Sequence, residues 1–116
     1  MTTVPHQDIS HFPVAPVDAL PVGEVARVTP PGLPPIAVFH TDDGLFAIDD
    51  TCTHQDTSLA DGWVEDCAVE CPLHQARFDL RTGIPSGRLA KIPVRTHPIV
   101  AVDGHIYLRL STPSTV

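Results

Sequence analysis

The stretch CTHQDTSLADGWVEDCAVECPLH, residues 52–74, contains two short pairs of metal-binding residue types. Cys52 and His54 form a Cys-x-His pair, and Cys71 and His74 form a Cys-x-x-His pair after sixteen intervening residues. A single cysteine or histidine is more often a core or surface residue than a ligand. Two mixed pairs beside turn residues are a far more specific pattern, and we interpret the four residues as ligands of one metal centre.

The composition of the pairs separates two kinds of metal centre. Two cysteines and two histidines can hold a structural zinc ion in a tetrahedral site. Zinc fingers, however, usually group like ligands, with a Cys-x-x-Cys pair followed by a pair of histidines. In a Rieske centre, two cysteines hold one iron of a [2Fe-2S] cluster and two histidines hold the other. The mixed pairs favour the Rieske arrangement, with zinc as the alternative.

Short apolar runs separated by turn residues predict an almost entirely β structure. The strongest turn signals are Asp43-Gly44, Asp61-Gly62 and Asp103-Gly104. No apolar repeat of helical period is long enough to compete. We therefore expect a small antiparallel β-sandwich or barrel, with both ligand pairs on loops that meet at one tip. The expected strands are Glu24–Val28, Ile36–His40, Leu45–Asp49, Ala68–Glu70, Ala90–Arg95, Ile99–Val102 and His105–Leu110.

Length and proline content suggest one small domain with several connections. A chain of 116 residues has room for a single core. The 13 prolines are frequent outside the expected strands, so we expect Val4–Pro21 and Thr29–Pro35 to be extended surface connections. We expect a domain of residues 12–110, with an N-terminal extension of residues 1–11 and a C-terminal tail of residues 111–116.

The charge and the cysteine content bear on partners and compartment. A formal net charge of −7 argues against nucleic-acid binding, which normally needs a basic face. No run approaches the roughly 20 apolar residues of a membrane span, and the first ten residues lack the features of a secretory signal. With two of three cysteines reserved for iron, Cys67 has no intramolecular disulfide partner, as in a reducing compartment. We expect a soluble, cytoplasmic protein.

Residues 52–74 resemble the Rieske-type ferredoxins that serve bacterial ring-hydroxylating dioxygenases, and the similarity extends from about Phe12 to Leu110. The resemblance implies a Rieske-type β fold and one [2Fe-2S] cluster per chain, held by the four residues named above. A further loop that covers the cluster would correspond to Ile84–Gly87. The flanking segments that share the resemblance are Leu45-Phe46-Ala47-Ile48, Phe78-Asp79 and Arg81-Thr82-Gly83.

The same resemblance implies a function in electron transfer. Such a ferredoxin catalyses no reaction alone and has no catalytic residues. It takes single electrons from a flavin-dependent NAD(P)H ferredoxin reductase and delivers them to a terminal oxygenase in aromatic hydrocarbon catabolism, and we expect a monomer. The alternative is a small Rieske-like subunit of a reductase such as the nitrite-reductase type, although many of those lack the ligands. A complete Rieske oxygenase is excluded because no sequence is left for its catalytic domain.

The chain departs from the respiratory Rieske proteins at positions that influence the reduction potential. Those proteins carry an additional cysteine in each ligand loop, and a serine and a tyrosine hydroxyl directed at the cluster. Thr57 and Leu73 stand where the cysteines would be expected, and Ala76 and Phe78 replace the serine and the tyrosine. Because fewer donors stabilise the reduced state, we expect a potential at the low end of the Rieske range, roughly −150 mV.

The remaining aromatic, cysteine and histidine residues are expected to have structural roles. Trp63 follows Asp61-Gly62 and is predicted to pack in the core at the start of a strand. Cys67 has no histidine at a matching spacing, so we expect a packing or turn residue. The histidines expected at the surface or at strand ends are His6, His11, His40, His97 and His105.

Overall fold

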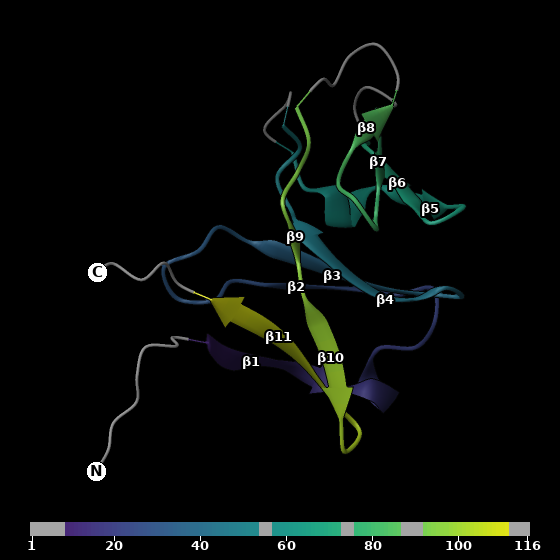
Figure 1. The fold of residues 1–116 in the computed structure, drawn as a ribbon. Helices are drawn as coiled ribbons and strands as arrows, with labels where there is room; N and C mark the ends of the chain where they lie inside the picture. Colours follow the sequence, from purple (N-terminus) through teal and green to yellow (C-terminus); the bar gives the residue numbers. More distant parts are fainter. Residues whose placement is uncertain (1–8, 54–56, 73–75, 87–91, 112–116) are drawn as a thin grey trace.

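The computed structural model describes residues 9–53, 57–72, 76–86 and 92–111 (Figure 1). Nearly all the regular structure is β, as predicted, with two single-turn 3-10 helices, η1 (Val17–Ala19) and η2 (Leu59–Asp61). Among the described residues, no helix has the length and apolar character needed to cross a membrane. The strands are β1 (Ile9–Pro16), β2 (Val25–Val28), β3 (Ile36–Thr41), β4 (Gly44–Asp49), β5 (Trp63–Glu65), β6 (Ala68–Glu70), β7 (Arg77–Asp79), β8 (Pro85–Ser86), β9 (Thr96–His97), β10 (Ile99–Val102) and β11 (His105–Ser111).

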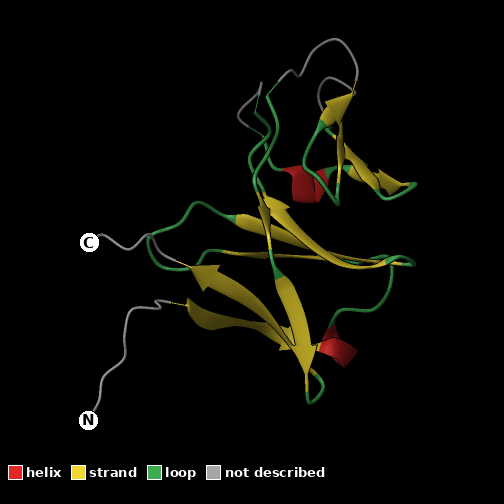
Figure 2. Ribbon diagram, in the orientation of Figure 1, coloured by secondary structure: helices red, strands yellow, loops and turns green. Residues whose placement is uncertain are grey.

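The described strands form three antiparallel sheets. One sheet has the order β1-β11-β10, the second β2-β3-β4-β9 and the third β5-β6-β7-β8. Figure 2 shows the third sheet and η2 grouped at one end of the molecule, above the second sheet. The second sheet lies between the other two, so it is the layer against which both ends of the molecule pack.

Strand β3 explains how this layered arrangement is held together. Its residues Ile36 to Phe39 are at most 2% exposed, so the strand is buried on both faces. Successive side chains of a strand point to opposite faces. Accordingly, Ile36 and Val38 pack in one core with Ile106 and Leu108 of β11, whereas Ala37 and Phe39 pack in a second core. The second core contains all three cysteines of the chain.

Six of the seven predicted strands are confirmed. Ala68–Glu70 and Ile99–Val102 have the predicted bounds. The other strands predicted in β2, β3, β4 and β11 differ from the observed ones by one residue at one end. The turn at Asp103-Gly104 is also confirmed, since both residues have positive φ, as a two-residue hairpin of the primed type requires.

Two predictions about the chain outside these strands are wrong. Within the expected connection Val4–Pro21, the described residues Ile9–Pro16 form β1, which pairs with β11. Strand β1 lies at the edge of its sheet, where the missing N–H groups of Pro13 and Pro16 are tolerated. Thr29–Pro35 is a connection as expected, but it is not confined to the surface because Pro30 is fully buried.

The predicted strand Ala90–Arg95 is also wrong over its described residues, 92–95. Pro93 cannot donate to a ladder, and the N–H of Val94 donates instead to the carbonyl oxygen of Gly83 at 3.0 Å. The strand of this region, β9, begins only at Thr96. The short strands β7 and β8 were not among the predicted strands, and for β5 the sequence predicted only a strand start at Trp63. Residues Pro85-Ser86 of the expected covering loop form β8, and Gly87 lies outside the described residues.

The contact between Gly83 and Val94 yields a test of the packing between these segments. Gly83 has a φ of +77°, and a Cβ atom there would overlap the carbonyl oxygen of Val94. Gly32 has nearly the same φ, +78°, but nothing within 4 Å of a Cβ atom. Alanine at either position should cost about 1–2 kcal/mol for the left-handed backbone. Gly83→Ala should cost about 1–3 kcal/mol more, because of the overlap.

The two free energies of unfolding are compared by urea denaturation of Gly83→Ala and Gly32→Ala. The Gly32 variant is the matched control, because it isolates the backbone cost from the steric one. Equal losses in the two variants would show that the Val94 segment moves away without cost.

Candidate metal centre

Cys52 and Cys71 occupy equivalent positions in two loops. Cys52 follows β4 and is 3% exposed, and Cys71 follows β6 directly and is fully buried. The N–H of Cys52 donates to the carbonyl oxygen of Thr57 at 3.0 Å, and that of Cys71 donates to the carbonyl oxygen of Ala76 at 2.7 Å. Each bond therefore joins a cysteine to the fifth residue after it. The same main-chain hydrogen bond, from residue i to residue i+5, therefore closes both loops. Both cysteine side chains belong to one core.

The two predicted histidine ligands lie outside the described residues. His54 follows Cys52 by two positions and His74 follows Cys71 by three, and each falls in a segment that the structure does not describe. In the described part of the chain, no group of three or more His, Cys, Asp or Glu side chains is arranged to hold a metal ion. The set of four ligands therefore stays a prediction. The structure shows only that its two cysteines are buried.

The first loop, which contains Cys52, is closed at its base by Asp50. The N–H of Leu59 donates to the main-chain carbonyl of Asp50 at 2.6 Å. The Asp50 Oδ1 atom accepts hydrogen bonds from the Ser58 hydroxyl and from the Ala60 N–H, both at 2.9 Å. Only 1% of Asp50 is exposed. The residue therefore ties the outgoing arm of the loop to its returning arm.

Residues 92–97 lie beside the end of β4 and contact the start of the first loop at Thr53. The Thr53 hydroxyl donates to the carbonyl oxygen of Ile92 at 2.7 Å. Asp49, at the end of β4, contacts the Arg95 Nε atom at 3.0 Å and the His97 Nε2 atom at 2.8 Å. His97 ends β9, as predicted for a strand-end histidine, but its side chain is only 11% exposed.

The other predicted histidine positions agree with the structure where it describes them. His11 and His105 are exposed, and His40 lies near the end of β3 with its Nδ1 atom 2.6 Å from the carbonyl oxygen of Leu20. His6 lies outside the described residues.

The surroundings of Cys71 are apolar. Ala76 is 2% exposed and Phe78 is fully buried, and both belong to the core that contains the cysteines. Neither side chain has a hydroxyl group. At these two positions the structure therefore offers a sulfur ligand a dry environment but no hydrogen-bond donor from a side chain.

Cys67 is a turn and packing residue, as predicted. It is 6% exposed, and with Asp66 it forms the turn between β5 and β6, where both residues have positive φ. Its carbonyl oxygen accepts the N–H of Leu80 at 3.0 Å. Burial raises the pKa of the Cys67 thiol. Arg81 lowers this pKa, whereas Asp43 and Asp79 raise it further.

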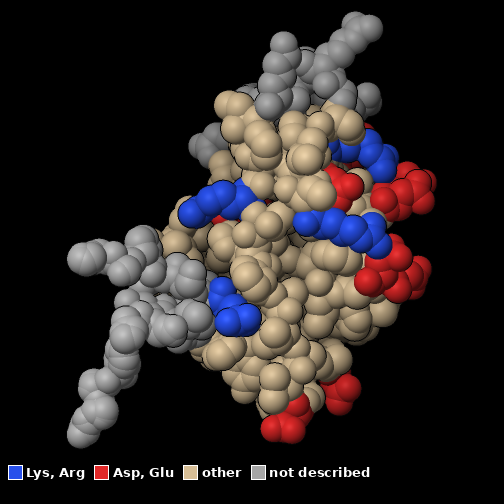
Figure 3. Space-filling model, in the orientation of Figure 1, with Lys and Arg blue, Asp and Glu red and all other residues tan. Residues whose placement is uncertain are grey.

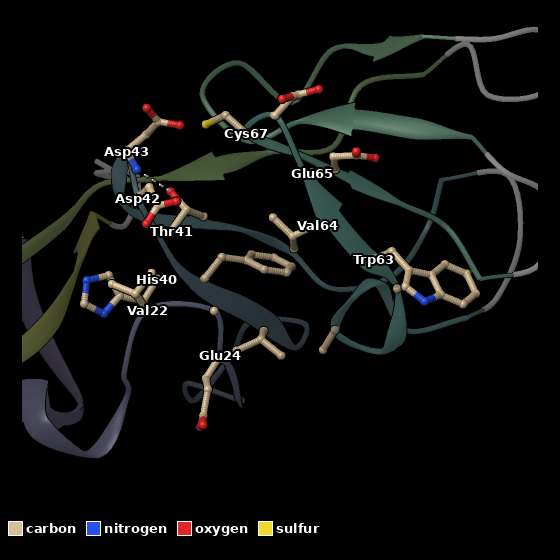
Figure 4. A pocket seen from close by; sticks show the side chains of 16 residues that line it. Val22, Glu24, His40, Thr41, Asp42, Asp43, Trp63, Val64, Glu65 and Cys67 are labelled. Atoms are coloured by element: carbon tan, nitrogen blue, oxygen red, sulfur yellow. Dashed lines mark hydrogen bonds between the residues drawn. The ribbon is translucent and has the colours of Figure 1, made fainter.

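The expectation that Trp63 packs in the core is wrong. Trp63 begins β5 as predicted, but it is 62% exposed. Together with Val64 it lines an open groove of about 470 Å³ between the β5–β6 hairpin and the turn that joins β3 to β4 (Figure 4). The carboxylates that line the groove are those of Glu24, Asp42, Asp43, Glu65 and Asp66.

Comparison with known proteins identifies relatives of the whole domain. A family model described as the Rieske [2Fe-2S] domain matches residues 10–102. The chain is 44% identical over 104 residues to the 3-phenylpropionate/cinnamic acid dioxygenase ferredoxin subunit of Photorhabdus laumondii, which covers 89% of this chain and 97% of that one.

Solved structures give the same result. The fold superposes with a TM-score of 0.79 on a protein solved as a complex of reduced oxygenase and oxidized ferredoxin in carbazole 1,9a-dioxygenase. That match has 30% identity and covers 84% of this chain and 99% of the other. A putative NADH-dependent nitrite reductase small subunit from Mycobacterium tuberculosis has a TM-score of 0.78 at 20% identity, over 94% of this chain and 100% of that one. At that identity the likeness shows a shared fold only.

The raised pKa of Cys67 predicts slow alkylation in the folded protein. A thiol reacts as its thiolate, so a raised pKa leaves less reactive species at about pH 8. Iodoacetamide should label Cys67 more slowly in the native than in the urea-unfolded chain, and the difference should narrow as the pH rises past the native pKa. Mass spectrometry of the peptide that contains Cys67 measures both rates. Equal labelling rates in the native and unfolded chains at about pH 8 would contradict the raised pKa of Cys67.

Proposed function

Because the chain belongs to the Rieske [2Fe-2S] domain family, we propose that it is the electron-carrying ferredoxin of a ring-hydroxylating dioxygenase system. It receives single electrons from a flavin-dependent NAD(P)H ferredoxin reductase and passes them to a terminal oxygenase. One observation carries this proposal. Within the matched domain, two buried cysteines lie in two loops that are closed by the same kind of main-chain hydrogen bond. The chain is a carrier and catalyses no reaction alone.

The relatives support this function over the alternative. The Photorhabdus laumondii protein, which the chain matches over 97% of its length, is named as a ferredoxin subunit. The carbazole 1,9a-dioxygenase relative was solved in complex with its oxygenase, which supports an oxygenase as one partner here. The nitrite reductase small subunit shares the fold at 20% identity, well below the 44% identity to the ferredoxin subunit. The proposal also includes a reductase as second partner, a monomeric carrier and a cytoplasmic location.

The cluster ligands we propose are Cys52 and Cys71 for one iron, and His54 and His74 for the other. The described residues fit such a group, because both thiols are at most 3% exposed and belong to one core. A soft thiolate in dry surroundings suits an iron–sulfur cluster, and the family match favours this cluster over zinc.

The residues around the cysteines determine how the carrier works. When bound, the cluster supplies one-electron oxidation and reduction. Leu59, Ala76 and Phe78 are at most 2% exposed and keep water away from the thiolates. Since Ala76 and Phe78 have no hydroxyl to donate to sulfur, they leave the added negative charge less stabilised. This supports a potential at the low end of the Rieske range, roughly −150 mV.

The three cysteines provide a matched test of the ligand assignment. Wild-type protein and Cys67→Ala should contain equal amounts of iron and acid-labile sulfide. After reduction, both should give a rhombic electron paramagnetic resonance signal with an average g value below that of four-cysteine clusters. Cys52→Ala and Cys71→Ala should lose the cluster and melt at a lower temperature, because metal binding and folding are linked. Stoichiometric zinc without sulfide in the wild type would refute the proposal.

The surface charge supports docking onto proteins that carry opposite charge. The net charge of the chain is −7. Figure 3 shows acidic side chains gathered along the edge formed by the β3–β4 turn and the β5–β6 hairpin, where the groove lies. Two of these acids have an arginine nearby, since Arg81 lies 3.6 Å from Asp43 and Arg77 lies 3.9 Å from Glu65. Asp42 and Asp66 are exposed on the same edge, where they can attract a basic partner.

Charge at the groove should therefore accelerate association with the oxygenase. In the variant Asp42→Asn with Asp66→Asn, the rate of electron transfer to the cognate oxygenase at low salt should fall severalfold. The substitutions are nearly isosteric, and asparagine tolerates the positive φ of position 66. At about 1 M salt the Debye length is about 3 Å, so the variant should match the wild type.

The control removes the same charge far from the groove. Asp18→Asn with Asp103→Asn changes two exposed aspartates near the opposite end of the molecule, in η1 and in the β10–β11 turn. Stopped-flow measurements across ionic strength compare the two variants. If both slow transfer equally, net charge rather than this edge guides the encounter.

A further inference from the structure

The two ligand loops have different supports. The second loop is held at its base by strand pairing, because Glu70 and Val69 of β6 pair with Arg77 and Phe78 of β7. The first loop follows β4, and in the described residues the strand pairing of its two arms is limited to an isolated bridge between residues 51 and 58, beside the main-chain hydrogen bonds of Cys52 with Thr57 and of Leu59 with Asp50. An isolated bridge offers few hydrogen bonds, so the first loop needs support from side chains.

Asp50 supplies this support on both sides of the loop. Its Oδ1 atom holds Ser58 and Ala60 of the returning arm at 2.9 Å each. Its own N–H donates to the carbonyl oxygen of Pro35 at 2.9 Å, which anchors it to the segment just before β3. Cys52 follows two residues later. The position of this cysteine therefore depends on an anchor at Asp50 that reaches both the loop and the central sheet.

Asp50 also places a charge inside the protein. Its Oδ2 atom lies 3.0 Å from the Arg27 Nε atom of β2, and in the described structure no aligned hydrogen bond reaches it. The Asp50 side chain is 1% exposed, whereas that of Arg27 is 56% exposed. Water therefore screens the guanidinium more than the carboxylate. A buried charge acts over longer distances than an exposed one, because the surrounding dielectric constant is lower.

We propose that Asp50 is a positioning residue of the metal centre and that the Asp50–Arg27 pair adjusts its reduction potential. The hydrogen bonds of Oδ1 fix the first ligand loop, and the pair sets part of the electrostatic potential at the cluster. A nearby carboxylate opposes the uptake of an electron, whereas a nearby guanidinium favours it. The inference rests on the proposed ligand role of Cys52.

Two substitutions of opposite charge separate tuning from simple disruption. Asp50→Asn keeps an oxygen for Ser58 and Ala60 but removes the negative charge, so the potential should rise. Arg27→Gln removes the positive charge, so the potential should fall. Combining the two should return the potential toward the wild-type value. The potentials are measured by spectroscopically monitored redox titration of the cluster-containing proteins at constant pH.

The neighbouring ion pair provides matched controls. Asp49 and Arg95 have the same 3.0 Å distance between Oδ2 and Nε, but Asp49 is 19% exposed and contacts β9 rather than the arms of the loop. Asp49→Asn and Arg95→Gln should therefore shift the potential less than the substitutions at Asp50 and Arg27. Shifts of equal size in both pairs, or a shift of the same sign in Asp50→Asn and Arg27→Gln, would overturn the tuning role.

The positioning role is tested without a change of charge. Ser58→Ala removes one hydrogen bond to Oδ1, and should release iron to a chelator roughly tenfold faster, given the usual strength of a hydrogen bond to a charged group. Release at the wild-type rate would overturn positioning. If Asp50→Asn does not fold, Arg27→Gln still tests the tuning, because Arg27 is half exposed. A wild-type protein without a cluster would instead refute the proposed function.

Discussion

The burial of strand β3 on both faces is the constraint on which the rest of the structure depends. Its four residues from Ile36 to Phe39 belong alternately to two cores, so neither core can be rearranged without moving the strand that the other also uses. One face receives the two buried cysteines of the ligand loops. The two cysteines of the proposed metal centre therefore pack against the central sheet, on the side where the small sheet β5–β8 lies.

The strands and turns that follow from a local pattern of apolar and turn residues could be predicted from the sequence. Strands β3, β4 and β11 have apolar runs of adequate length, and the Asp103-Gly104 turn has residues that suit positive φ. Strands β7 and β8 have three and two residues, which are too few positions to show a period, whereas β6, which also has three residues, was predicted from its short apolar run. Strand β1 was missed because its prolines are typical of connections, and only its edge position makes them compatible with a sheet.

The candidate site shows the same division between local pattern and tertiary contact. The spacing of cysteines and histidines in residues 52–74 indicated the chemistry, because ligand type and order are visible in the sequence. The contact between Arg27 and Asp50 spans 23 positions and depends on how β2 lies beside the first loop. Two consecutive aspartates just before a Cys-x-His pair were a signal for such contacts. Trp63 was wrongly predicted to be buried, because the sequence does not show which face of a short strand packs against the rest of the protein.

The division of the interior into two cores separates the cluster ligands from half of the packing. The core of Leu20, Ile36, Val38, Ala47, Ile106 and Leu108 contains no cysteine, whereas the three cysteines lie in the core on the other face of β3. Half of the interior therefore packs against β3 through apolar side chains alone, without any contribution from the residues that would bind iron.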